Sequence, residues 1–109
     1  MAVRKLRSPE IIEGAEINAI VDTQELYGKG DMFGHVRLVT GAVVEWHTHI
    51  DEVDYYYILK GTGIYTDVDG TEYTVRPGDV CTIAPGQGHA IRNEAEETLE
   101  FIALVLFSK

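Results

Sequence analysis

Three of the four histidines in this sequence lie where a folded chain could gather metal ligands. His47 and His49 are one residue apart in a segment rich in β-branched and aromatic residues. Residues two apart on a strand share a face, so both imidazoles are expected to point the same way. Asp54 follows after a short loop, and Glu52 has the same strand parity. Two imidazoles and one of these carboxylates could hold a divalent transition metal and leave coordination positions open.

His89 is the natural third nitrogen ligand. It opens a later strand, directly after a glycine-rich turn at residues 85–88. Imidazole binds iron, manganese, nickel, cobalt and zinc, so the ligand types alone do not choose the metal. The sequence therefore predicts one divalent metal ion on His47, His49, His89 and a carboxylate.

Three further side chains are candidates for acid–base catalysis beside this metal. Tyr56 has the strand parity of Asp54, so it is either a pocket donor or a packing residue with its hydroxyl at the rim. Glu45 has the parity of His47, although its neighbours could equally turn it outward. His35 enters the interior together with Arg37, or both face outward; we favour outward, because Val36 and Leu38 need a core.

The elements that must position these residues are strands. Val, Ile, Thr, Tyr and Phe form short runs punctuated by glycine, which predicts an all-β sandwich or barrel. Asp69-Gly70 predicts a hairpin with a type I′ turn, residues 76–79 predict a second turn, and residues 23–26 predict a weak helical turn. Because residues 101–107 are apolar on both faces, we expect a central strand or a subunit interface. The expected strands are 16–21, 32–40, 43–49, 55–60, 62–67, 71–76, 80–84, 89–93 and 98–107.

Length and charge restrict the function further. The 109 residues predict an N-terminal arm at 1–15 and a single domain at 16–109. The net charge of −9 argues against nucleic acid and anionic membranes, because both select basic surfaces. The longest apolar run is too short to span a membrane. Cys81 is the only cysteine, and we read it as a buried apolar residue of a cytoplasmic protein.

Two segments resemble the paired signature motifs of the cupin superfamily. In that family a glycine-flanked His-x-His-glutamate motif precedes a glycine-, proline-, histidine- and asparagine-containing motif. Asp54 stands here in place of the glutamate, and Ala84 in place of the first proline. The remaining positions match at Gly41, His47, His49, Gly61, Gly78, Gly86, His89 and Asn93.

The resemblance implies a cupin jelly-roll β-barrel, also called a double-stranded β-helix. It further implies a metal-dependent enzyme acting on a small oxygen-rich acid or sugar, as a dioxygenase, decarboxylase or isomerase. The alternative is a module that binds or senses a small ligand without turnover, because one fold hosts many functions. The apolar last strand and the arm also fit a homodimer.

Overall fold

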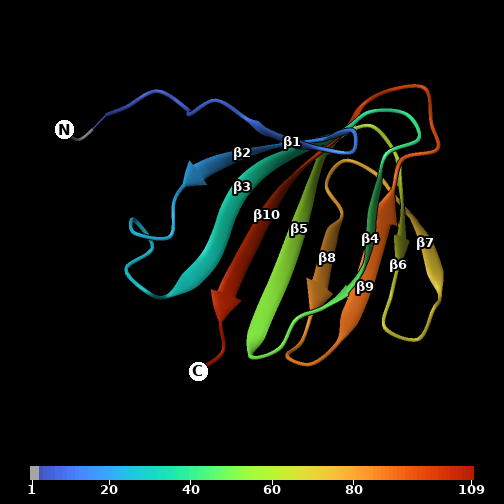
Figure 1. Ribbon diagram of the computed structural model, residues 1–109. Coiled ribbons are helices and arrows are strands. Elements are labelled where there is room, and N and C mark those ends of the chain that lie inside the picture. Colours follow the sequence, from blue (N-terminus) through green and yellow to red (C-terminus); the bar gives the residue numbers. More distant parts are fainter. Residues whose placement is uncertain (1–2) are drawn as a thin grey trace.

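The protein is built from two antiparallel sheets packed face to face (Figure 1). The computed structural model describes residues 3–109, and within these residues all regular structure is β-strand. The larger sheet has six strands, in the order β1 (Glu10–Ile12), β2 (Ala15–Val21), β3 (Gly30–Leu38), β10 (Leu99–Phe107), β5 (Glu52–Lys60) and β8 (Val80–Ile83). The smaller has four, in the order β4 (Val43–Thr48), β9 (Gly88–Arg92), β6 (Gly63–Thr66) and β7 (Glu72–Val75).

All nine strands expected from the sequence are present, and the all-β jelly-roll prediction is confirmed. Strand β1 is additional; its three residues are exposed and are ordered by pairing with β2. In the described part of the chain, the two sheets remain separate ladders and do not close into one continuous barrel.

Strand β10 lies at the centre of the larger sheet, between β3 and β5. This position explains why its sequence is apolar on both faces. One face, with Phe101, Ala103 and Val105, packs between the sheets. The other face, with Ile102 and Leu104, is half-buried on the outside of the sheet.

The core fills the space between the two sheets. Each fully buried aliphatic or aromatic side chain contributes about 1.5–3 kcal/mol relative to leaving it exposed. The side chains that anchor this layer come from four strands, so the sheets are held in a fixed relative position. They include Leu38, Ile58, Ile91, Leu99 and Phe101.

The turns agree with the sequence in position but not always in type. Residues 76–79 form the expected turn, closed by the Asp79 N–H donating to Arg76 O at 3.0 Å. The hairpin between β6 and β7 also forms, but the type I′ expectation is wrong. Gly70 has a φ of 85°, whereas Asp69 is not left-handed. The loop is longer, because the Asp67 N–H donates to Thr71 O and the Gly70 N–H donates to Asp67 O.

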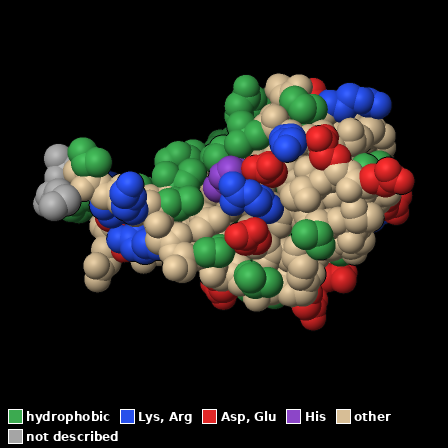
Figure 2. All heavy atoms as spheres, turned by 90° about the horizontal axis from the view of Figure 1, so that it is seen from above, with side chains coloured by type: hydrophobic (Ala, Val, Ile, Leu, Met, Phe, Trp, Pro, Cys, Tyr) green, Lys and Arg blue, Asp and Glu red, His purple; other side chains and the backbone are tan. Residues whose placement is uncertain are grey.

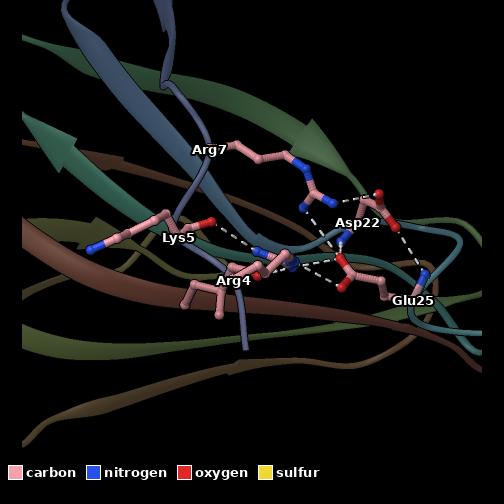
Figure 3. Close-up of polar contacts among 6 residues, drawn as sticks. Arg4, Lys5, Arg7, Asp22 and Glu25 are labelled. Atoms are coloured by element: carbon pink, nitrogen blue, oxygen red, sulfur yellow. Dashed lines mark hydrogen bonds and ion pairs between the residues drawn. The ribbon is translucent and has the colours of Figure 1, made fainter. Parts of the chain in front are cut away.

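The N-terminal segment runs beside the part of β2 that β1 does not pair, where it contacts Asn18 and Ile20 (Figure 3). Arg4 pairs with Glu25 at 2.6 Å, and Arg7 pairs with Asp22 at 3.3 Å. The Asn18 amide donates to Arg7 O at 2.9 Å. The acceptors Asp22 and Glu25 belong to the turn after β2, where the Leu26 N–H donates to Asp22 O as the weak helical turn predicts. Residues 3–109 contain no helix that is long and apolar enough to cross a membrane.

Candidate metal centre

Four side chains converge between the sheets and present one ligand atom each. His47, His49, Asp54 and His89 place these atoms within 4.8 Å of one another. Asp54 Oδ2 is 2.9 Å from His49 Nε2 and 3.0 Å from His89 Nε2, and His89 Nε2 is 3.1 Å from His47 Nε2. Metal–ligand bonds of about 2.1 Å at right angles separate neighbouring ligands by about 3 Å. The cluster therefore has the spacing of adjacent ligands around one octahedral ion.

Each imidazole is held by its other nitrogen, which leaves Nε2 facing the centre. His47 Nδ1 donates to the backbone carbonyl of Glu45 at 2.8 Å, and His49 Nδ1 donates to Glu52 Oε1 at 3.0 Å. Both partners only accept, so the proton of each neutral ring lies on Nδ1 and the Nε2 lone pair faces inward. His89 Nδ1 lies 2.8 Å from the Tyr65 hydroxyl. Such outer contacts fix ring orientation at metal sites.

The centre holds polar atoms that the protein itself does not satisfy. Within residues 3–109, His49 Nε2 and Asp54 Oδ1 are buried and lack a hydrogen-bond partner of acceptable geometry. Asp54 is only 2% exposed and His89 only 1% exposed. Burial lowers the pKa of His47, with the neighbouring His89 and His49 adding to the effect. Burial therefore opposes a proton at His47, and the donor set of three imidazoles and one carboxylate fits a divalent transition metal.

A bulge in β4 decides which of its side chains face the centre. Val44 pairs with Ile91 and His47 pairs with His89, so β4 holds one more residue than β9 between these pairs. The extra residue turns Glu45 and Trp46 to the exposed side. The inward direction expected from parity is therefore wrong and the outward alternative is correct, so Glu45 contributes only its carbonyl.

The carboxylate comes from inside β5 rather than from a loop before it. Asp51 adopts a φ of 58°, and the strand then begins at Glu52. Alternation from this start buries Asp54 and places it in the centre. Glu52, the alternative ligand in the sequence, backs His49 instead.

The segment before His89 is a tight turn tied to His49. Gly86 has a φ of 82°, its N–H donates to His49 O, and the His49 N–H donates to Gln87 O at 3.1 Å. The Ala84 N–H donates to Gln87 Oε1 at 3.0 Å. A proline at position 84 has no N–H and could not make this contact, so alanine there accompanies a different closure of the turn.

The remaining candidates from the sequence lie either between the two sheets or on the outer face of the larger sheet. Tyr56 is inside, stacked on His89 with ring centroids 5.1 Å apart. Burial raises its pKa well above the ordinary value, and the Asp54 charge adds to the effect, so the hydroxyl stays protonated. His35 and Arg37 lie on the outer face, where both contact Glu100. The structure therefore brings Tyr56 to the cluster but neither His35 nor Glu45.

Cys81 and Tyr65 are two further residues near the centre. Cys81 is buried, and burial raises the pKa of its thiol to about 12, as expected for an inert core residue. Tyr65, which holds His89, was not found by sequence reasoning. It lies in β6, outside both histidine segments, and its sequence neighbourhood is that of an ordinary strand.

A cavity of about 150 Å³ opens beside the cluster. It is bounded by strands of the larger sheet and by β4. Its walls are His47, His49, Asp54, Tyr56, Ile17, Met32, Val36, Val44, Phe101, Ala103 and Val105. A ligand entering it would meet the metal ligands at one side and hydrocarbon on the others.

The comparison with protein families settles the family. The model of the cupin domain matches residues 34–106, which contain the whole cluster. The chain belongs to the cupin family. This cupin is 32% identical over 91 residues to an oxalate-binding protein of Thermotoga maritima, covering 84% of this chain and 74% of that relative.

Solved cupin structures agree with the fold. A predicted oxalate decarboxylase from Thermotoga maritima superposes with a TM-score of 0.89 at 29% identity, covering 95% of this chain and 99% of that one. A polyketide cyclase from Streptomyces resistomycificus superposes with a TM-score of 0.81 at 19% identity, covering 100% of this chain and 81% of that one. The second likeness concerns the fold alone.

Proposed function

We propose that this cupin binds one divalent transition metal ion and, on that ion, a small chelating carboxylic acid. The observation that carries the proposal is the convergence of four ligand atoms between the sheets, in a cluster where His49 Nε2 and Asp54 Oδ1 are buried without a hydrogen-bond partner. His47, His49, Asp54 and His89 would hold the ion. Four protein ligands on an octahedral ion would leave two positions for a chelating acid. The name of the oxalate-binding relative supports this ligand class.

The test of this proposal is metal stoichiometry. Chelator-stripped protein is reconstituted anaerobically with Fe²⁺, Mn²⁺, Co²⁺, Ni²⁺ or Zn²⁺ and analysed by mass spectrometry. We expect about one equivalent in the wild type and loss of stoichiometric binding in the double variant His47→Ala, His89→Ala. His35→Ala is the matched control, because His35 lies on the outer face. Full metal occupancy in the double variant would refute the ligand assignment.

A second candidate is catalysis at the same metal, as a decarboxylase, dioxygenase or isomerase. Tyr56 favours it, because its side chain lines the cavity beside Asp54 and its ring stacks on His89. It could deliver a proton to a reacting acid. If so, Tyr56→Phe should lower kcat at least tenfold while metal binding persists. If no compound in a broad panel of small acids and sugars is turned over, the catalytic candidate is wrong and only the binding function remains.

Charge and cysteine content bear on the biological setting. The acidic charge supports a small-molecule ligand rather than nucleic acid or an anionic membrane. The single buried thiol supports a cytoplasmic location. We also propose that the protein forms a homodimer through the outer face of the larger sheet.

A further inference from the structure

The cavity beside the cluster differs in chemistry from the cluster itself. Apart from the metal-ligating residues, it is lined by aliphatic and aromatic side chains and by Met32, and Tyr56 is the only one of these that carries a hydroxyl. Within the described chain, its lining includes neither lysine nor arginine. A charged or polar group beyond the metal would therefore lie against apolar walls, which is unfavourable without hydrogen-bond partners.

The size of the cavity indicates what could fill it. Apolar cavities near 150 Å³ stay dry and admit groups as large as benzene. The cavity here has about that volume, and part of it adjoins the metal positions. Once the chelating head of a ligand is bound, the space left suits a hydrocarbon group of about three or four carbon atoms.

The negative charge of the neighbouring surface disfavours dianionic ligands. A hollow of about 360 Å³ shares Ile17 and Met32 with the cavity wall. Its lining includes Glu10, Asp31 and Asp22, of which Asp22 is paired with Arg7 at 3.3 Å. Two carboxylates on one ligand would meet this negative charge, whereas one carboxylate is neutralised at the metal.

We propose that the ligand is a 2-oxo or 2-hydroxy monocarboxylic acid with a short branched aliphatic side chain. The carboxylate and the adjacent oxygen would chelate the metal, and the side chain would pack against Val36, Phe101 and Ala103. This inference rests on the proposed function, because the chelating head requires the metal. It names a ligand class that differs from oxalate, which has no hydrocarbon group to bury.

The test is an affinity series on Co²⁺-loaded protein, in which the metal absorption spectrum reports ligand entry. The series is pyruvate, 2-oxobutyrate, 2-oxoisovalerate and 2-oxoisocaproate. All four have the same chelating head, so differences in their affinity for the protein report on the side chain rather than on metal chelation. Each buried methylene group should strengthen binding about fourfold. We expect the dissociation constant to fall at least tenfold from pyruvate to 2-oxoisovalerate. Oxalate is measured in parallel.

A variant of the wall provides an independent check. Ala103→Val fills part of the cavity, so it should reduce the gain from pyruvate to 2-oxoisovalerate to threefold or less. Ala90→Val is the matched control, because Ala90 alternates with the buried His89 and faces away from the cavity. Val36→Ala enlarges the cavity and should move the preference toward 2-oxoisocaproate, which keeps the test informative if Ala103→Val does not fold.

The outcomes separate the two proposals. A series that strengthens with side-chain size, and flattens in Ala103→Val alone, supports the inference. A flat or weakening series on metal-loaded protein that still binds oxalate overturns the inference and leaves the proposed function intact. Protein that takes up no stoichiometric metal overturns both.

Discussion

Tyr65 occupies the position from which His89 can be oriented. Its hydroxyl lies 2.8 Å from His89 Nδ1, and both side chains are buried. Burial raises the pKa of Tyr65, so the hydroxyl stays intact at any physiological pH. With a metal on Nε2, the neutral ring carries its proton on Nδ1, and the Tyr65 oxygen accepts it.

Removal of that acceptor should weaken metal binding. Tyr65→Phe leaves the His89 N–H unpaired in the core, and loss of such an outer contact typically costs 10–100-fold in metal affinity. The measurement is competitive metal titration against a chelating dye. Tyr73→Phe is the control, because Tyr73 is the cross-strand neighbour of Tyr65 but is 51% exposed. Equal affinities for Tyr65→Phe and the wild type would contradict a positioning role.

The metal ligands were predictable from the sequence because two of them share a strand face. His47 and His49 keep the common direction that their spacing predicts, because the bulge in β4 lies before His47. Asp54 and Glu52 share parity, so only the start of β5 after Asp51 decides between them. Tyr65 carried no signal, since its role depends on the pairing of β6 with β9 far along the chain.

At the scale of elements, strand order along the chain was predictable and local irregularity was not. Alternation and turn residues indicated nine of the ten strands. The bulge in β4 is set by pairing with β9 and by Trp46, whose ring lies against Gly88. A Cβ at position 88 would approach that ring to 2.6 Å. No short-range pattern in the sequence encodes such a contact, so the sequence left the direction of Glu45 open.

The N-terminal segment depends on an ion-pair cluster that can be tested directly. Figure 2 shows basic side chains gathered near this projecting end, with acidic ones spread over the rest of the visible face. Hydrogen bonds from Arg4, followed by the backbone N–H of Asp22, lower the pKa of Glu25 from 4.5 to about 2. A carboxyl group with a lowered pKa stabilises the folded arrangement above its ordinary pKa, and this contribution is lost as the pH falls toward 2.

Glu25→Gln should therefore release residues 3–9 at neutral pH without unfolding the sheets. The pairs are solvent-exposed and screened, so the melting temperature should change little. Amide hydrogen exchange in this segment should increase several-fold, and high salt should have the same effect on the wild type. Glu96→Gln, an exposed glutamate outside the cluster, should change neither measurement. Unchanged exchange in Glu25→Gln would show that other contacts, such as the Asn18 amide to Arg7 O, hold the segment.

The outer face of the larger sheet carries exposed apolar side chains. Tyr55, Tyr57 and Val80 are 37%, 49% and 60% exposed there. They adjoin the half-buried Ile102 and Leu104 of the central strand β10. Within residues 3–109, no helix or second layer covers this face. The nine-residue strands β3, β10 and β5, each about 30 Å long, lie side by side here with the four-residue β8 at the edge.

A second copy of the chain is the partner that this face suits, because a two-fold axis lets one apolar patch bury itself. We expect a dimer by light scattering at micromolar concentration. Tyr57→Glu with Val80→Glu puts two unpaired charges at cross-strand positions in the interface, so it should give a folded monomer. Tyr73→Glu with Val68→Glu makes the same change around the other sheet and should leave the dimer intact. A monomeric wild type, or a dimer that survives the first pair of substitutions, would rule out this face as the interface.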